Sequence, residues 1–341
     1  VLEKIAKLES IDNIVPILSD ATDIPFYNSI DTVLLNGVLE WIGYYGKIEK
    51  PEDIVNSQIN VLKNCYLSLK NDGVLVIAIE NRFAPYFLYH PDHCGSYFTS
   101  YLPRKLSNFI TKILYNKPYN TYTYDYYTYK LLLRKVGFKD VRIYGCWPIY
   151  RYPRLVYNLE NEDAIKNLPQ LNLLRKRREI AYFKVISKSL SLARLLANSY
   201  IIFAFKEKGE LLGDILYSGS GLTVKIFDLK DRKVICKIRQ KTYAEIVLNS
   251  IKHAYNDREK ISPRLEKIIH DKRMYVEKMI YGKKIDLTDY EKIKRIFEIL
   301  CKIYKKHAQR VAVNDYVNEV LEKVKLISRK TYIDFNQSFL H

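Results

Sequence analysis

The sequence of 341 residues is poor in the features that define several classes of protein. Its five cysteines form no CxxC pair, so we expect neither a disulfide framework nor a structural zinc site, and a reducing compartment is the simplest interpretation. No apolar run reaches the roughly 18 residues that a membrane-spanning helix needs. The opening VLEKIAKLES mixes charges of both signs and is no signal peptide. We therefore expect a cytoplasmic protein.

Positive charge is in excess, with 56 Lys and Arg against 38 Asp and Glu and a net charge of +18. A lysine-rich solvated surface explains it as well as an anionic partner does, whether nucleic acid, a membrane surface or a phosphorylated substrate. No nucleic-acid motif of recognisable spacing accompanies the charge, so we expect no nucleic acid. Peripheral contact with an anionic membrane stays open. The densest basic patches cover residues 174–178, 230–241 and 302–306.

The first part of the chain alternates strand and helix patterns. With 48% hydrophobic and 28% charged residues the chain is globular, and its length suggests two domains at about 100–200 residues each. Strand, helix and strand joined by short loops predict an α/β fold with a parallel sheet. The predicted elements are a helix over residues 1–10, strands over 13–18 and 31–35, a helix over 51–69, a turn at 71–73 and a strand over 74–79.

The pattern continues to a domain boundary after residue 208. Gly137 is the expected C-cap of one helix, and residues 151–196 are polar and helical in pattern. The elements expected here are a helix over 128–136, strands over 140–144 and 199–205, and this helical segment between them.

Residues 209–341 show a different order, typical of an α+β module. Two antiparallel strands come first, a helix and a strand follow, and long helices end the chain. We place strands at 215–227, 234–238 and 273–279, a turn at Gly282, and helices at 243–255, 289–307 and 315–326.

Polar residues follow three successive predicted strands. Ligands bind beyond the carboxyl ends of parallel strands, so these residues are candidates for a binding site, although Asp, Asn and Gly also form ordinary turns. A carboxylate at Asp20 could accept from an amine such as that of adenine, and Ala21 leaves room for a ring. The other candidates are Asn36, Gly37 and Glu40 after the second strand, and Glu80, Asn81 and Arg82 after the third.

These segments resemble a known family. SDATDIPF, a strand that begins at an aspartate, and LLNGVLEWIG look like the middle of a class I S-adenosylmethionine-dependent methyltransferase. NDGVLVIAIENRFAPYFLYHPDHCGSYF is similar to methyltransferase domains of polysaccharide and lipopolysaccharide biosynthesis, which carry an AIENR…DH-G pattern. TYKLLLRKVGFKDVRIYGCWPIYRYP and ANSYIIFAFKE resemble the later strands of that domain.

The resemblance covers about residues 1–206 and implies a Rossmann-like sheet. It also implies S-adenosylmethionine as cofactor, held by Asp20, Ala21, Asn36 and Gly37, and a sugar or lipid-linked glycan as acceptor. Trp41 stands where such enzymes often have His, so no role passes to it. The glycine-rich turn and the acidic residue of the second strand are missing. We therefore expect the chain to be a fragment that lacks the first strand, turn and helix and the second strand, and that is inactive by itself.

Methyl transfer to a hydroxyl needs positioning and a base. His93 is the candidate base because imidazole titrates near neutral pH, with Asp92 and Glu80 as further catalytic residues. Asn81 and Arg82 are assigned to substrate, since guanidinium groups bind anions in bidentate fashion. The structural alternative is that residues 92–93 cap a turn and that Arg82 pairs with Glu80. No metal is expected.

Two further features leave alternatives open. The segment YNTYTYDYYTY (residues 119–129) could offer aromatic platforms to a sugar or could pack in the core. SGSG (218–221), Lys237 and Glu245 resemble the small lobe of a protein-kinase-like fold, followed by MYVEKMIYGKKI as strand and hinge. That module could be a noncatalytic scaffold or part of a glycan kinase.

Overall fold

The computed structural model describes residues 13–15, 17–24, 26–48, 50–170, 176–210, 213–218, 223–239, 241–256 and 265–279. All of them belong to one compact unit, Val1–Ile280. The helix predicted over residues 1–10, the turn at Gly282 and the helices predicted after it lie outside the described residues. The described strands form one mixed sheet in the order β1-β2-β5-β3-β4-β6-β7-β8-β10-β9.

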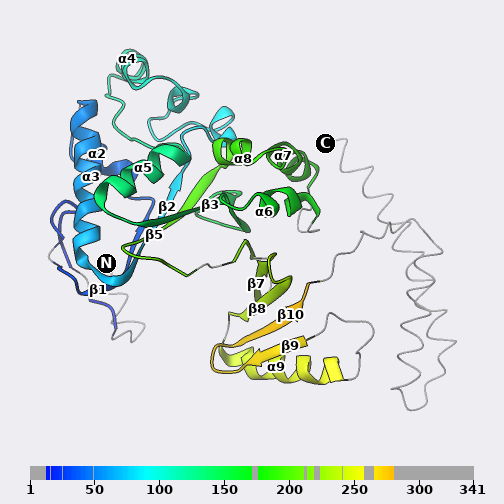
Figure 1. Cartoon of the computed structure of the whole chain (residues 1–341). Coiled ribbons are helices and arrows are strands. Elements are labelled where there is room, and N and C mark those ends of the chain that lie inside the picture. The colour runs from blue at the N-terminus through cyan, green and yellow to red at the C-terminus, as the bar shows by residue number, and fades with distance from the viewer. Residues whose placement is uncertain are drawn as a thin grey trace. The chain divides into compact units, whose positions relative to one another are not determined.

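The predicted strand, helix and strand between residues 31 and 79 are confirmed. They are β1 (Ile30–Asn36), α3 (Pro51–Ser68) and β2 (Leu69–Glu80). β1 and β2 are parallel, with Leu34 opposite Val76, and Figure 1 shows α3 beside them. One face of β2 packs in the core through Leu75, Ile77 and Ile79, whereas Val74 and Val76 on the other face are only half-buried, so the strand is less covered than its apolar run predicts.

Two predictions near this pair are wrong. Residues 71–73 form no turn but lie within β2, where the pairing jumps from Ile30–Leu69 to Thr32–Val74 and the residues between them bulge. Residues 13–15 and 17–18 form no strand. Their apolar side chains are exposed, and within the described residues β1 pairs with β2 alone, so these residues have no neighbouring strand to pair with.

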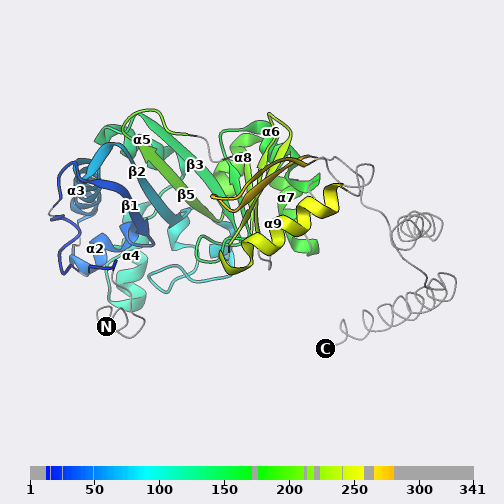
Figure 2. The ribbon, with the colours of Figure 1, turned by 90° about the horizontal axis from the view of Figure 1, so that it is seen from below.

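β5 (Ser199–Phe205) runs antiparallel between β2 and β3 (Asp140–Trp147). Figure 2 shows these strands side by side. α5 (Tyr126–Val136) precedes β3; Asp125 caps its first turn, and Gly137 ends it at a φ of 126° that favours glycine. The predicted helix and both strands are confirmed.

Residues 151–196 are only partly helical. A strand, β4, interrupts them because its apolar residues pair with the outer edge of β3. The elements are β4 (Leu155–Asn158), α6 (Glu162–Asn167), η4 (Leu168–Gln170), α7 (Arg177–Ile186) and α8 (Leu190–Leu196). Short elements around the site are η1 (Leu39–Trp41), α2 (Ile42–Tyr45), η2 (Pro85–Leu88), η3 (Thr99–Tyr101) and α4 (Arg104–Tyr115).

The later strands are antiparallel, as predicted, but the single strand predicted over 215–227 is wrong, because its two halves form separate strands, β6 and β7, that pair with each other. β4 pairs with β6 across the predicted domain boundary. β9 was not predicted from its LEKII sequence, whose two adjacent charges hide the strand alternation. The elements are β6 (Ile215–Tyr217), β7 (Thr223–Asp228), β8 (Lys233–Ile238), α9 (Lys241–Asn256), β9 (Leu265–Ile269) and β10 (Met274–Lys278).

The tyrosine-rich segment packs in the core. Five of its six tyrosine rings are almost completely buried, whereas Tyr127 is exposed, and buried rings contact one another, as Tyr124 and Tyr129 do with centroids 5.4 Å apart. The structure thus favours packing over a sugar platform. The buried members of the segment are Tyr119, Tyr122, Tyr124, Tyr126 and Tyr129.

Gln58 on α3 ties the core to the loop after β1. Its amide donates to the carbonyls of Leu39 (2.7 Å) and Tyr122 (3.0 Å) and accepts from the hydroxyl of Tyr124 (2.6 Å). We expect Gln58→Ala to lower the free energy of unfolding by about 2–4 kcal/mol, since three buried groups lose their partner. Urea unfolding checks this, with Lys63→Ala on the exposed face of α3 as control; equal stability of the two variants would contradict it.

Candidate functional site

Two carboxylates meet at the carboxyl edge of the parallel pair. Asn36, the last residue of β1, lies opposite Ala78 of β2, and Glu80 ends β2. The chain leaves β1 through Gly37 and enters η1, which contains Glu40. Parallel pairing therefore brings Glu40 and Glu80 to one edge of the sheet.

His93 completes a cluster with these two residues. Its Nε2 atom lies 3.3 Å from Oε2 of Glu80, and one donor atom from each of the three residues lies within 4.8 Å of the others. Glu40 is fully buried, and neither of its carboxylate oxygens has a hydrogen-bond partner. Buried polar groups are normally paired, so this cluster is built for something other than stability.

The cluster shifts the protonation of its members. Burial, then the charge of Glu80, raises the pKa of Glu40 to about 7. Burial alone would lower the pKa of His93, but Glu80 and then Glu40 outweigh it and raise that pKa. Arg151 adds a second positive charge, with Nη2 3.7 Å from Oε1 of Glu80. The site thus retains a proton near neutral pH.

Asp92 shapes the loop that presents His93. Its Oδ1 accepts from the backbone amides of Cys94 (2.9 Å) and Ser96 (3.3 Å), and its Oδ2 from the hydroxyl of Thr99. Because both oxygens are engaged, the geometry favours the turn-capping alternative for Asp92. Its predicted part in catalysis stays a prediction.

His93 connects the buried carboxylates to a pocket of about 760 Å³. Its ring lies against that of Trp41, with centroids 4.9 Å apart, and Tyr44 meets Trp41 edge-on. One wall of the pocket is thus aromatic, and the imidazole of His93 belongs to its lining. The lining residues are Trp41, Tyr44, Tyr45, Lys47, His93, Cys94, Thr111, Tyr115, Lys117, Pro118 and Asn120.

Asn81 and Arg82 turn away from this cluster. The buried amide of Asn81 donates to the carbonyls of Leu195 and Ala197, both at 2.7 Å. The guanidinium of Arg82 donates to the carbonyls of Ser100 (2.7 Å) and Leu102 (2.5 Å). These bonds tie the end of β2 to the surrounding loops. The described contacts of Arg82 include no ion pair with Glu80, and substrate binding by the two residues stays a prediction.

The predicted cofactor residues lie in two loops. Asp20 is exposed, and its Oδ1 accepts from the amide (2.7 Å) and hydroxyl (2.6 Å) of Thr22, which lowers its pKa. The hydrogen bonds described for it leave Oδ2 open to an amine. Ala21 packs on the edge of the core, and Asn36 is exposed.

Gly37 has a φ of 64°, and a Cβ there would lie 2.3 Å from the hydroxyl of Tyr150. The position therefore requires glycine. The chain can turn directly from β1 toward Glu40 only because no side chain stands there.

Sequence patterns missed part of this site. Trp41, to which the family resemblance assigns no role, forms part of the pocket wall. Arg151, to which no sequence pattern points, provides the second cation beside Glu80. Glu40 was noticed at a strand end but not as a partner of Glu80 and His93. Two carboxylates and an imidazole could also hold a divalent cation; the expectation of no metal stays a prediction.

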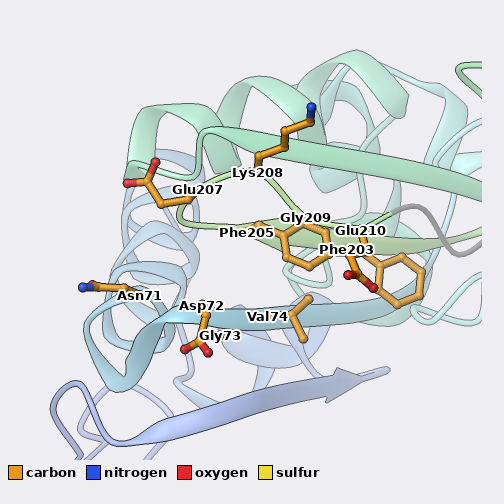
Figure 3. A pocket seen from close by; sticks show the side chains of 10 residues that line it. All are labelled: Asn71, Asp72, Gly73, Val74, Phe203, Phe205, Glu207, Lys208, Gly209 and Glu210. Atoms are coloured by element: carbon orange, nitrogen blue, oxygen red, sulfur yellow. The ribbon is translucent and has the colours of Figure 1, made fainter.

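A second pocket, of about 630 Å³, lies at the opposite edge of the sheet (Figure 3). Val74 and Phe205, which pair with each other, line it, whereas Glu80 pairs with Ser199. Six residues of extended strand separate the two edges by about 20 Å. This pocket contains none of the predicted site residues.

The kinase-like residues are described only in part. Lys237 on β8 and Glu245 on α9 are both exposed, and the described ion pairs include none between them. Residues 219–222 and the segment after Met279 lie outside the described residues. Searched over the described residues, the helices include none with the length and apolar character to cross a membrane.

The chain was compared with known proteins by sequence and by structure. No family model and no curated protein matches the chain. A SAM-dependent methyltransferase from Archaeoglobus fulgidus is 18% identical, with 60% of this chain and 80% of that chain covered and a TM-score of 0.29. One from Thermotoga maritima is 14% identical, with 60% and 70% covered and a TM-score of 0.31.

A third solved structure is that of Haemonchus contortus phosphoethanolamine N-methyltransferase 2 with S-adenosylhomocysteine. It is 15% identical, with 55% of this chain and 36% of that chain covered and a TM-score of 0.25. With TM-scores this low, these likenesses identify no family by themselves. The features that bear on function are the strand order and the cluster of Glu40, Glu80 and His93.

The buried carboxylate of Glu40 should make stability depend on pH. Its folded-state pKa of about 7 exceeds the ordinary 4.5, so stability falls as pH rises through this window. We expect Glu40→Gln to be more stable than the parent chain by about 3 kcal/mol above the window and little changed below it. Urea unfolding at about pH 5 and about pH 8 in EDTA checks this. Glu52 is exposed, so Glu52→Gln is the control. The same pH-dependent gain in stability in that variant would contradict the prediction for Glu40.

Proposed function

We propose that the chain is part of a S-adenosylmethionine-dependent methyltransferase that acts on a hydroxyl group of a sugar or lipid-linked glycan. The observation that supports this most is the cluster of Glu40, Glu80 and His93 at the carboxyl edge of β1 and β2, joined through His93 to an aromatic-walled pocket. Ligands of open α/β sheets bind at this edge.

The strand order adds support. Parallel β1 and β2 are followed by β3, and the closing strand β5 inserts antiparallel between β2 and β3. A class I methyltransferase sheet ends in this way, and the elements are those in which the sequence resembles that family.

The cluster suits proton removal from a hydroxyl. S-adenosylmethionine would supply an electrophilic methyl group on its sulfonium. His93 would accept the proton of the acceptor hydroxyl, so that its oxygen could take that methyl group. Glu80, 3.3 Å from Nε2, stabilises the imidazolium that forms.

The cofactor residues proposed from the sequence fit a nucleoside in part. The open Oδ2 of Asp20 can accept from an adenine amine, whereas the space beside Gly37 is taken by the hydroxyl of Tyr150. The acceptor is assigned to the pocket because Trp41, Tyr44 and Tyr45 offer the flat apolar surfaces on which sugar rings stack. Lys47 and Lys117 suit a phosphate at its rim.

Replacing the base should separate chemistry from binding. We expect His93→Ala to lower methyl transfer by about 10²- to 10⁴-fold while the affinity for S-adenosylhomocysteine stays unchanged. Transfer is measured with labelled S-adenosylmethionine and a panel of nucleotide-linked and polyprenyl-linked sugars, and affinity by calorimetry. Exposed His90→Ala is the matched control, and EDTA should change neither variant.

Asp20→Ala should weaken S-adenosylhomocysteine binding without changing the fold. A full-length gene product that does not bind S-adenosylhomocysteine would overturn the methyltransferase assignment. Loss of transfer in EDTA would instead assign the three donor atoms to a metal.

For residues 209–341 we propose a nucleotide-binding lobe similar to that of protein kinases. β6, β7 and β8 form an antiparallel meander, α9 follows, and β9 and β10 extend the same sheet beside β8. Ile238 of β8 packs against Ala244 and Leu248 of α9. This order fits a lobe in which Lys237 and Glu245 serve ATP phosphates.

Binding of magnesium-ATP tests the lobe directly. We expect ATP with Mg²⁺ to raise the unfolding temperature by a few degrees, because a ligand of the folded state stabilises it, and Lys237→Ala to abolish the shift. Exposed Lys225→Ala on β7 is the control. No shift in the parent chain would leave the lobe as a scaffold without nucleotide.

A further inference from the structure

The helix α4 has its polarity reversed. Its small polar residues face the protein: Ser107 is buried and donates to the carbonyl of Thr99 at 2.7 Å, and Thr111 is buried one turn later. Its large apolar residues face solvent, with Phe109 62% and Ile113 65% exposed. A helix on a globular surface normally does the opposite.

The exposed residues form one stripe. Positions 106, 109 and 113 follow the spacing of a single helix face, and position 114 adjoins it, so four large apolar side chains lie together in solvent. We call this the α4 stripe. It consists of Leu106, Phe109, Ile113 and Leu114.

Positive charge surrounds the α4 stripe. Residues 93–124 contain no aspartate or glutamate. Lys105 and Lys112 lie on the same helix beside the stripe, and Lys117 follows its last turn; all three are exposed. An apolar stripe bordered by lysines is the pattern of a helix that lies in the interface of an anionic membrane.

We propose that the α4 stripe inserts into the surface of an anionic lipid bilayer, with the three lysines at the level of the headgroups. A second copy of the chain would fit less well. A symmetric contact through this face would oppose the lysines of one copy to those of the other. The net charge of +18 favours the same anionic surface.

The helix α4, which carries the proposed membrane surface, also borders the pocket. Thr111, Tyr115 and Lys117 line its wall, so the helix that enters the lipid surface is the helix that borders the pocket. If the proposed function holds, this arrangement selects acceptors that are themselves anchored in the membrane. This step rests on the proposed function, whereas membrane binding does not.

Vesicle binding tests the proposal without cofactor or acceptor. The probes are vesicles of phosphatidylcholine with about one third phosphatidylglycerol, and vesicles of phosphatidylcholine alone. We expect co-sedimentation at least about tenfold stronger with the anionic vesicles, weakened by salt. Phe109→Ser with Ile113→Ser should weaken binding at least about tenfold, since both apolar side chains would leave the lipid.

Leu131→Ser on α5 is the matched control, because Leu131 is equally exposed, at 67%, but lies on another helix. It should bind vesicles as the parent chain does, and both variants should unfold at the parent temperature. A parent chain that ignores both vesicles, or a double variant that binds as before, would overturn the proposal. So would a dimer in light scattering that the double variant abolishes while no vesicle binds.

Methyl transfer failing while vesicles bind would overturn only the proposed function. Vesicle binding failing in a chain that transfers methyl groups would overturn only the membrane proposal.

Discussion

Parallel pairing of β1 with β2 is the constraint on which the candidate site depends. The register that sets Asn36 opposite Ala78 makes both strands end at one edge, and the turn at Gly37 then leads directly to Glu40. A shift by one residue would turn Glu80 to the other face of the sheet. The apolar run of β2 fixes the register through burial, so packing of the sheet determines where the two carboxylates meet.

The two carboxylates at this edge lower the stability of the fold. Two carboxylates out of water repel each other and lose hydration, and among the described residues His93 and the partly exposed Arg151 are the cations near enough to compensate. Gln58 and Tyr122 hold η1 by backbone contacts that do not satisfy the carboxylate of Glu40. An apolar residue there would be more stable, so the arrangement fits a site that binds or moves protons.

The sequence predicts this fold well where a pattern reports burial. The runs at 31–35, 74–79 and 199–205 became β1, β2 and β5 because each pairs with a neighbouring strand and packs one face in the core. The run at 13–18 is as apolar but is exposed, since the described residues offer it no strand to pair with. For the site, strand ends identified Glu80, and the resemblance singled out His93. Their association with Glu40 and Trp41 depends on tertiary contacts that spacing does not report.

The helix α4 shows what helix periodicity cannot predict. An apolar stripe indicates which side of a helix avoids water, but it does not say whether protein or lipid covers that side. In α4 the hydroxyls of Ser107 and Thr111 occupy the buried side, so the stripe was left outward. The pocket lies between two unsatisfied features, the buried carboxylate of Glu40 without a hydrogen-bond donor and the exposed apolar α4 stripe. Neither improves the stability of the isolated chain, and both border the same pocket, which argues that this side of the molecule is organised for ligands.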